Sequence, residues 1–306
     1  MPEQRKSAGR PLVGGVGISN PQRVIDKASG ATKLALAEYY LAVADRLVPQ
    51  LAGRPLSIVR APEGVDGESF FQRHCGRLKM PHMHALPKNL DPEHARLIQA
   101  DNITAVIEAV QMGTVEFHTW NARSDRVERP DRVIFDLDPD PALPWSSMVE
   151  ATELTLRLLD DLGLQAFLKT SGGRGMHVVM PLDRRHDWDL ARQFARSVTE
   201  RLAREAPELI VDKMGPQNRV GRIFVDYLRN QRGASTVAAY SARARPGLAV
   251  SVPVEREELA QLERADRWNI GNLDDRLQTL RSDPWARYGA VRQGLTQALL
   301  KRLEKG

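Results

Sequence analysis

The chain of 306 residues contains a single cysteine, Cys75, and no run close to the ~18 consecutive apolar residues of a membrane-spanning helix. No intramolecular disulfide can form, and a cysteine-rich zinc site is excluded. The first ten residues, MPEQRKSAGR, lack the apolar core of a secretory signal. We therefore expect neither a membrane protein nor a secreted disulfide scaffold, and a single cysteine is consistent with a reducing cytoplasm.

The composition is that of an ordinary globular protein with a basic excess. Hydrophobic residues make up 42% of the chain and charged residues 27%. The length suits one large domain or two coupled subdomains. The formal net charge is +5, and most of the cations are arginine, whose planar group fits phosphate oxygens. This balance favours a polyanionic partner such as nucleic acid, although a protein without such a partner can carry the same modest excess.

Hydrophobic periodicity and turn residues predict a mixture of helices and strands, which indicates an α/β or α+β fold. Residues 1–16 are rich in charge, Gly and Ser and predict a flexible lead-in, followed by a domain over residues 17–306. Helices are predicted over residues 33–51, 103–110, 145–162, 188–204 and 285–303. Strands are predicted over residues 55–60, 115–120, 133–138, 166–170, 176–182, 222–228 and 236–241, with loops over residues 61–92.

Two aspartates occur two residues apart in the segment VIFDLDPD, residues 133–140. Side chains of a strand alternate between its faces, so Phe135 and Leu137 are expected to point into the core. Asp136 and Asp138 then lie together on the other face, where their repulsion is unfavourable unless a cation lies between them. Oxygen ligands of this kind suit Mg²⁺ or Mn²⁺ rather than zinc. The alternative is a pair of solvated acids at the end of a strand.

A third carboxylate, Asp226, lies in the apolar segment IFVDYL. A buried acid without a partner is unfavourable. One interpretation is a salt bridge to a nearby arginine such as Arg222. The other is that Asp226 joins Asp136 and Asp138 in a three-carboxylate site for two metal ions.

The segment KTSGGRGMH, residues 169–177, predicts a glycine turn between two strands. Its three glycines permit close backbone approach and expose N–H groups. Ser171 supplies a hydroxyl, Arg174 a cation, and His177 a donor for a phosphate oxygen. This composition suits a phosphate cradle, but it matches neither a P-loop nor a dinucleotide fingerprint. An ordinary glycine-rich hairpin is the alternative.

Several arginines surround or follow Asp226, and such cations can bind a triphosphate or a nucleic-acid backbone; they are Arg219, Arg222, Arg229, Arg232, Arg243 and Arg245. For Arg222 and Arg232 we favour a solvated basic face. Upstream, Phe70 and Phe71 are adjacent and cannot both face one core in an extended chain. One of them could stack on a base, although one core residue and one half-exposed residue is the simpler expectation.

The order DLDPD, TSGGRGMHV and IFVDYLRN resembles the archaeo-eukaryotic primase superfamily. More closely, the chain resembles the polymerase domain of bacterial ligase D, a multifunctional end-joining ligase, from about Gly17 to the C-terminus. The matching segments also include TKLALAEYY, RPLSIVRAPEG, FFQRH, GTVEFHTWNA, RPDRVIFDLDPDPALPW, FLKTSGGRGMH, NRVGRIFVDYLRN and TVAAYSARAR.

The resemblance implies a role for each matching residue. Asp136 and Asp138 would bind both of two Mn²⁺ or Mg²⁺ ions, and Asp226 would hold the ion that activates the primer 3′-hydroxyl. Residues that would contact the incoming nucleotide are Ser171, Arg174, His177, Arg219, His118 and Arg243. Nucleic-acid contacts would come from Phe70 and Phe71 on the template side and from Arg23 and Lys33 at a 5′-phosphate. The family more often has lysine in place of Arg23 and Arg174, which changes the expected geometry of the phosphate contact.

The resemblance further implies a two-part α/β body whose catalytic half resembles an RNA-recognition motif, flanked by helices and packed against a second sheet. The implied activity is nucleotide addition, preferably of ribonucleotides, to 3′-hydroxyl ends of gaps and overhangs during non-homologous end joining. Implied partners are DNA, nucleoside triphosphates, ligase and phosphoesterase domains, and the end-binding protein Ku, in the bacterial cytoplasm at the nucleoid. The charged lead-in is consistent with a domain from a longer chain. A non-catalytic end-bridging module and a primase remain the alternatives.

Overall fold

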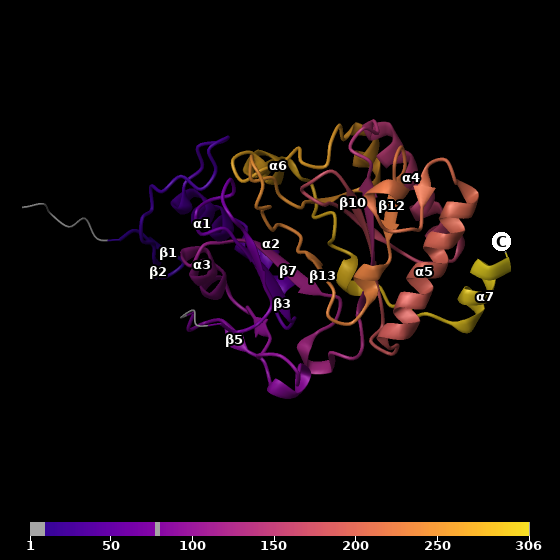
Figure 1. The fold of residues 1–306 in the computed structure, drawn as a ribbon, viewed down its shortest axis with the longest axis horizontal. Helices are drawn as coiled ribbons and strands as arrows, with labels where there is room; N and C mark the ends of the chain where they lie inside the picture. The colour runs from indigo at the N-terminus through magenta and orange to yellow at the C-terminus, as the bar shows by residue number, and fades with distance from the viewer. Residues whose placement is uncertain (1–9, 77–79, 306) are drawn as a thin grey trace, which may run out of the picture.

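The computed structural model describes residues 10–76 and 80–305, and its strands form two larger sheets and one small hairpin (Figure 1). In the hairpin, β1 (Leu12–Val13) pairs with β2 (Val16–Gly17), and Val13 is buried. The flexible lead-in predicted over residues 1–16 is therefore wrong for residues 12–16, and its first nine residues lie outside the described part. The hairpin is held because Val13 packs against the core.

The first large sheet has the order β13-β7-β3-β6-β5, with β4 paired to β3. Its strands are β3 (Leu56–Arg60), β4 (Phe70–Gln72), β5 (His84–Ala85), β6 (Ile98–Gln99), β7 (Thr114–Trp120) and β13 (Ser235–Val237). The accompanying helices are α1 (Lys33–Ala42), α2 (Ala44–Leu51) and α3 (Ile103–Gln111). Loops were predicted over residues 61–92, so β4 and β5 correct that prediction. The short pairings of these strands leave little hydrophobic alternation for a sequence pattern to detect.

The single helix predicted over residues 33–51 is two helices that meet at Val43. The hydroxyl of Thr32 caps α1 by accepting a hydrogen bond from the backbone N–H of Ala35 at 3.1 Å. The break allows Tyr40 of α1 and Leu47 of α2 both to be buried. The Tyr40 ring meets the Phe117 ring edge-on at 5.3 Å, which joins α1 to β7.

The second large sheet has the order β11-β12-β8-β10-β9-β14. Its strands are β8 (Arg132–Pro139), β9 (Phe167–Thr170), β10 (Met176–Pro181), β11 (Ile210–Val211), β12 (Ile223–Asp226) and β14 (Pro253–Val254). All of its pairings are antiparallel except the parallel pair β11 and β12. Helices α4 (Trp145–Asp161) and α5 (Trp188–Glu205) pack against this sheet, and α6 (Leu273–Thr279) follows later in the chain. Phe135 and Leu137 are fully buried, as the alternation in β8 predicts.

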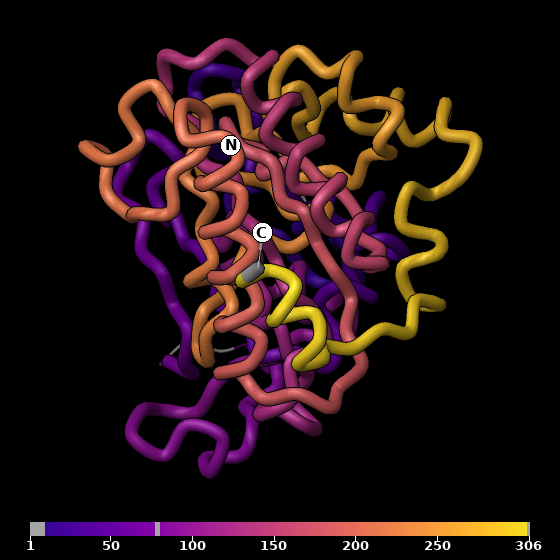
Figure 2. The backbone as a smooth tube through the Cα atoms, turned by 90° about the vertical axis from the view of Figure 1, so that its right-hand side faces the viewer, coloured from indigo at the N-terminus to yellow at the C-terminus, as the bar shows by residue number. Residues whose placement is uncertain are grey.

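The closing helix predicted over residues 285–303 is shorter, because only α7 (Gln297–Lys305) is α-helical there. Trp285 instead stacks on Tyr288 at 5.0 Å and donates from its indole N–H to the carbonyl oxygen of Leu168. Trp285 lies in a turn and Tyr288 begins a short 3₁₀ helix (Tyr288–Ala290), and the spacing of these aromatic residues produced a pattern that resembled a longer α-helix. Figure 2 shows α7, in yellow, running beside α5.

The mixed α/β character expected from the sequence is confirmed. The predicted strand over residues 236–241 is limited to β13, since Tyr240 adopts a positive φ of 66° that ends the extended chain. Within residues 10–76 and 80–305, no helix is long and apolar enough to cross a membrane.

Candidate active site

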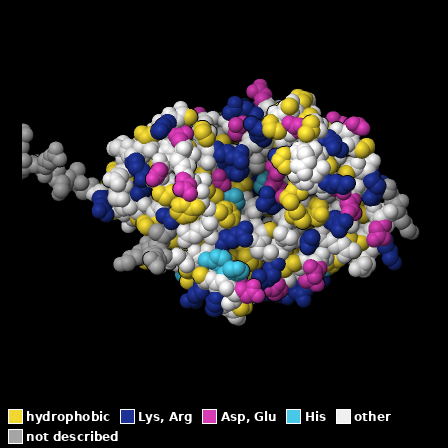
Figure 3. Space-filling model, in the orientation of Figure 1, with side chains coloured by type: hydrophobic (Ala, Val, Ile, Leu, Met, Phe, Trp, Pro, Cys, Tyr) yellow, Lys and Arg dark blue, Asp and Glu magenta, His cyan; other side chains and the backbone are white. Residues whose placement is uncertain are grey.

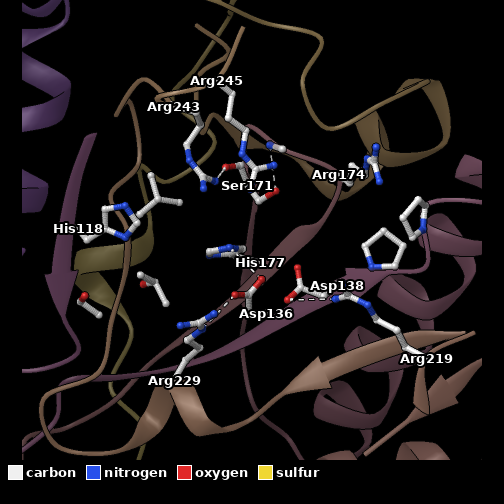
Figure 4. Close-up of a pocket in the computed structure, with 16 residues that line it drawn as sticks. His118, Asp136, Asp138, Ser171, Arg174, His177, Arg219, Arg229, Arg243 and Arg245 are labelled. Atoms are coloured by element: carbon white, nitrogen blue, oxygen red, sulfur yellow. Dashed lines mark hydrogen bonds and ion pairs between the residues drawn. The ribbon is translucent and has the colours of Figure 1, made fainter. Parts of the chain in front are cut away.

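A pocket of about 410 Å³ is lined by polar residues of both sheets and of the segments between them. β8 contributes aspartates, β7 contributes His118, and β13 contributes Ser235 to Val237. Figure 4 shows cationic side chains arranged around these groups. The labelled residues of this view are His118, Asp136, Asp138, Ser171, Arg174, His177, Arg219, Arg229, Arg243 and Arg245.

Strand register brings the chemically important groups into one row across the second sheet. Asp136 lies directly opposite His177 on β10 and Asp226 on β12. Lys169 on β9 lies opposite His177 and continues the row. Directly opposed residues project from the same face, and Asp138 joins them two positions along β8. The structure therefore brings together the three aspartates that the sequence singled out.

The three carboxylates differ in their affinity for protons. Burial opposes ionisation of Asp136, but the charge and hydrogen bond of His177 and the charge of Arg229 hold its pKa well below the ordinary value. Burial and repulsion from Asp136 raise the pKa of Asp138 to about 7. Burial also raises the pKa of Asp226. Acids that repel one another in a pocket form the kind of donor set that a divalent cation stabilises.

Arg229 provides the positive charge between two of these acids. Its Nε lies 3.3 Å from Oδ2 of Asp136 and 3.1 Å from Oδ2 of Asp226. Sequence reasoning named Arg222 as a possible partner of Asp226, but Arg222 donates to the carbonyl oxygen of Asn218 instead. Arg229 was not selected as a site residue. Its spacing of three residues from Asp226, through a 3₁₀ turn at Leu228–Asn230, is the signal that could have identified it.

His177 is 3% exposed and contacts Asp136, with 3.2 Å between Nε2 and Oδ1. Burial, assisted by the charge of Lys169, lowers the pKa of His177 to about 4. A neutral imidazole facing an ionised carboxylate carries its proton on Nε2. Among the described residues, no group hydrogen-bonds to Nδ1. His177 therefore orients Asp136 and retains one unpaired nitrogen.

The glycine turn between β9 and β10 packs closely against neighbouring backbone. A Cβ atom at Gly175 would lie 2.1 Å from the carbonyl oxygen of Leu137, and Gly172 has a positive φ of 65°. The hydroxyl oxygen of Ser171 accepts hydrogen bonds from the N–H groups of Gly173 and Gly175, each at 3.1 Å. The turn thus requires glycine, and it fixes the Ser171 side chain at the pocket wall.

Arginines from three separate segments surround this turn. Arg243 donates to the carbonyl oxygen of Ser171 at 2.6 Å, and Arg245 also lines the pocket. Arg174 is exposed at the pocket rim. An NH1 nitrogen of Arg219 lies 4.0 Å from Oδ2 of Asp138. Arg243 and Arg245 do not belong to a strand, so a loop sets their positions.

His118 on β7 faces the same pocket from the first sheet. Its Nε2 lies 2.6 Å from Oε2 of Glu116, as expected for two residues on one strand face. Burial opposes ionisation of Glu116, yet His118 and Arg243 lower its pKa to about 2. Burial lowers the pKa of His118 in spite of this carboxylate. The imidazole is therefore neutral, donates through Nε2, and keeps Nδ1 as an acceptor.

Comparison with known proteins identifies the family of this chain. The family model described as the LigD primase-polymerase domain matches residues 32–285. The chain belongs to this family. The resemblance to the polymerase domain of ligase D is therefore confirmed.

Relatives of the family share the fold and much of the sequence. The multifunctional non-homologous end joining protein LigD of Pseudomonas aeruginosa is 55% identical over 300 residues, covering 98% of this chain and 36% of that protein. LigD of Mycolicibacterium smegmatis is 29% identical over 81% of this chain and 33% of its own length. The chain thus spans about a third of the length of these relatives. The polymerase domain of Mycobacterium tuberculosis ligase D, solved in complex with DNA, superposes with a TM-score of 0.82 at 28% identity, covering 90% of this chain and 98% of that one.

In this LigD primase-polymerase domain, Phe70 and Phe71 are 43% and 45% exposed. The expectation that one ring would enter the core is wrong, because β4 is an edge strand paired on one side to β3. The guanidinium of Arg60 lies 4.9 Å from the Phe70 ring centre. The Phe71 ring meets His118 edge-on at 5.5 Å and so adjoins the pocket. Both rings present surface on which a base could stack.

Arg23 and Lys33 lie beside each other, since the N–H of Lys33 donates to the carbonyl oxygen of Arg23 at 2.9 Å. Arg23 is exposed, whereas Lys33 is 7% exposed and donates from Nζ to the carbonyl oxygen of Ser19. Burial and the charges of Arg23 and Arg10 lower the pKa of Lys33 to about 8. Three neighbouring cations, one of them buried, repel one another, and a bound anion would relieve this repulsion.

Proposed function

We propose that this domain is a DNA-repair polymerase that adds nucleotides to 3′-hydroxyl ends and fills short gaps at double-strand breaks in non-homologous end joining. The observation that carries the proposal is the meeting of Asp136, Asp138 and Asp226 beside a glycine turn ringed by arginines. Carboxylates suit metal ions, and the turn and arginines suit phosphates.

Asp136 and Asp138 would hold two Mg²⁺ or Mn²⁺ ions, and Asp226 would hold the one nearer the primer. The fit rests on an all-oxygen donor set and on the burial and the repulsion from Asp136 that raise the pKa of Asp138 to about 7. Such ions, when bound, activate an attacking hydroxyl and stabilise a leaving oxygen. Arg229 contacts Asp136 and Asp226 and would give way to a cation between them.

The reaction is an in-line displacement at the α-phosphate of a nucleoside triphosphate. The primer 3′-oxygen forms a bond to the α-phosphorus, the bond from that phosphorus to the bridging oxygen breaks, and pyrophosphate leaves. The hydroxyl proton passes to solvent. Arg174, Arg219 and Arg243 would neutralise the triphosphate, and Ser171 would donate its hydroxyl proton, since its oxygen already accepts twice. His177 would reach a phosphate oxygen through Nδ1 and would take up a proton there.

Three more contacts complete the proposal. Arg23 and Lys33 would bind the 5′-phosphate at the far edge of a gap. Phe70 and Phe71 would stack on the template side. His118 would accept a hydrogen bond from the ribose 2′-hydroxyl through Nδ1, which favours ribonucleotides over deoxyribonucleotides.

Partners follow from the relatives, which are described as multifunctional or bifunctional end-joining proteins. We propose that ligase and phosphoesterase activities act with this domain, that Ku presents the DNA ends, and that the work takes place in the bacterial cytoplasm at the nucleoid. DNA with gaps or 3′ overhangs and nucleoside triphosphates are the proposed substrates.

The test is extension of a labelled primer across a short gap with Mn²⁺ and all four ribonucleotides. The proposal expects added nucleotides and released pyrophosphate. Binding of the gapped duplex with no extension would instead support a non-catalytic end-bridging module. Synthesis on a template without any primer would indicate a primase.

A further inference from the structure

A cluster of two histidines and an aspartate lies outside the polymerase pocket. Nε2 of His74 lies 2.9 Å from one carboxylate oxygen of Asp91, and Nδ1 of His94 lies 2.8 Å from the other. The three ligand atoms all lie within 4.8 Å of one another. The two imidazole rings stack at 5.3 Å with 20° between their planes, so both present a nitrogen to the same carboxylate.

From this geometry we propose that His74, Asp91 and His94 form a second metal site, which takes Zn²⁺ or a similar transition-metal ion and is distinct from the catalytic site. Two imidazole nitrogens and one carboxylate oxygen are ligands of this class of ion, whereas Mg²⁺ and Ca²⁺ prefer oxygen alone. Three protein ligands leave a fourth position for water. The outer site thus differs in chemistry from the three aspartates.

The cluster is accessible without rearrangement of the fold. The side chains of His74 and Asp91 are 26% and 16% exposed, while that of His94 is 61% exposed. Zinc bonds of about 2.0–2.1 Å place tetrahedral ligand atoms a little over 3 Å apart, so the present contacts need to widen only slightly. His94 is on the solvent side and can rotate to admit the ion. Figure 3 shows histidine side chains gathered beside basic ones on the face toward the viewer.

A metal ion at this site would link the end of β4 to the segment between β5 and β6. His74 follows β4 by two residues and forms an isolated bridge with Leu97, and the side chain of Gln72 donates to the carbonyl oxygen of His74. Asp91 and His94 belong to the segment between β5 and β6, the purple loop at the lower edge of Figure 1. A metal bond across this loop would order it, because ligands far apart in sequence become fixed to one another.

The segment between β5 and β6 also contacts the segment after β12, which contributes Arg229 to the polymerase pocket. Arg232 donates from NH2 to the carbonyl oxygen of Leu90 at 2.7 Å, next to Asp91. Arg232 follows Arg229, the partner of Asp136 and Asp226, by three residues. β4 carries Phe70 and Phe71. A metal ion bound by the cluster would therefore hold in place both β4 and the segment that carries Arg229 and Arg232. Its role is therefore positional, and it takes no part in the chemical step.

The experiment measures Zn²⁺ binding to the chain after chelator treatment, by competition with a chromophoric chelator, with metal content measured after gel filtration. The background is the double variant Asp136→Asn, Asp138→Asn, which removes the acids of the catalytic site. We expect one Zn²⁺ per chain in this background. His94→Ala and the near-isosteric Asp91→Asn should each weaken binding by more than about 10-fold, and circular dichroism checks that both remain folded.

The matched control is His82→Ala, which removes a comparably exposed histidine that pairs with Glu108 outside the cluster. It should leave Zn²⁺ binding unchanged, as should Cys75→Ser. Co²⁺ in place of Zn²⁺ should give visible absorption of low-symmetry nitrogen and oxygen coordination, lost in His94→Ala. Hydrogen exchange in peptides spanning residues 84–97 should slow when Zn²⁺ is added. Absence of stoichiometric binding, or an equal loss in His82→Ala, would overturn the proposal.

Discussion

Asp138 is held in a position that opposes its own ionisation. Its side chain is 41% exposed, and repulsion from Asp136 together with burial raises its pKa to about 7. In the unfolded chain an aspartate titrates near 3.9. Between these values the unfolded chain has lost a proton that the folded chain keeps. Stability therefore falls as pH rises from about 4 to 7, and the full penalty is present above 7.

Removing this charge should stabilise the fold while it abolishes activity. We expect Asp138→Asn to raise the free energy of unfolding at pH 8 by roughly 1 kcal/mol, a discounted value because solvent screens a partly exposed acid. At pH 4 the gain should vanish. Urea unfolding at both pH values without divalent metal measures it. Asp140→Asn is the control, because hydrogen bonds from Ala142 and Gly221 lower the pKa of Asp140 and its removal should not stabilise. An equal gain at both pH values would contradict the account.

Sugar choice is the second residue-scale prediction. His118→Ala should reduce the preference for ribonucleotides by about 5-fold, since a net hydrogen bond contributes about 1 kcal/mol. Most of the loss should fall on ribonucleotide incorporation. Ser235→Ala is a matched control, because this pocket hydroxyl is already engaged with Ser57. Competition between ribo- and deoxyribonucleotides measures the ratio. Ser171 is the other candidate for the contact with the 2′-hydroxyl. No change in the ratio with either His118→Ala or Ser171→Ala would show that other residues set the preference.

For individual residues, the sequence indicated which side chains belong to the site but not which other side chains they contact. The aspartates were predictable, because alternation along one strand places Asp136 and Asp138 on one face. The spacing of Arg229 from Asp226 indicated one contact, but the contact of Arg229 with Asp136 was not predictable, because it depends on the pairing of β12 with β8. The exposure of both Phe70 and Phe71 depends on the place of β4 at a sheet edge, which sequence spacing does not encode.

The glycine turn is the element on which the proposed phosphate contacts depend. A methyl group at Gly175 would collide with the carbonyl oxygen of Leu137 at 2.1 Å and separate β10 from β8 beside Asp138. Gly175→Ala should lower kcat/KM by about 10²-fold, the effect of displacing aligned groups by about 1 Å. Gly289→Ala is the control, because the described chain has no atom within 4 Å of a Cβ there and its φ is not positive. Near-parent activity of Gly175→Ala in steady-state extension would refute this role of the turn.

The longer helices and strands were predicted from the sequence, whereas the shorter ones were not. Helices α4 and α5 and strands β8 and β10 were predicted closely, since each has a sustained apolar period. The helix predicted over residues 285–303 failed because buried Trp285 lies in a turn and half-buried Tyr288 begins a short 3₁₀ helix, where their spacing resembles that of an α-helix. Short strands such as β5 and β6 form through pairing with distant segments, so their own residues carry little signal.

For the whole molecule, the arrangement of two sheets separates the proposed contacts at the gap edge from the proposed catalytic site. Lys33 is the first residue of α1 and is hydrogen-bonded to Arg23, and α1 lies on the side of Figure 1 away from β10 and β12. Arg23→Ala and Lys33→Ala should weaken binding to gaps with a 5′-phosphate by at least several-fold and leave gaps with a 5′-hydroxyl almost unchanged. The preference should shrink as salt rises, because phosphate contacts release counterions. It should also shrink from pH 7 to pH 9, because Lys33, with a pKa of about 8, loses its charge.

Fluorescence anisotropy with the two gapped duplexes measures this preference. Equal weakening on both substrates would mean that the two residues belong to a general basic surface. Arg23→Ala is the cleaner variant, because Arg23 is exposed whereas Lys33 is buried.

The most direct test of the central claim is single-nucleotide extension of a gapped duplex with Mn²⁺, set beside DNA binding, for the parent and for Asp136→Ala, Asp138→Ala and Asp226→Ala. The account predicts that each variant loses extension while its affinity for the duplex stays close to that of the parent, because the carboxylates serve the chemical step. A variant that lacks one of these carboxylates and still extends the primer at a near-parent rate would contradict the assignment of the active site.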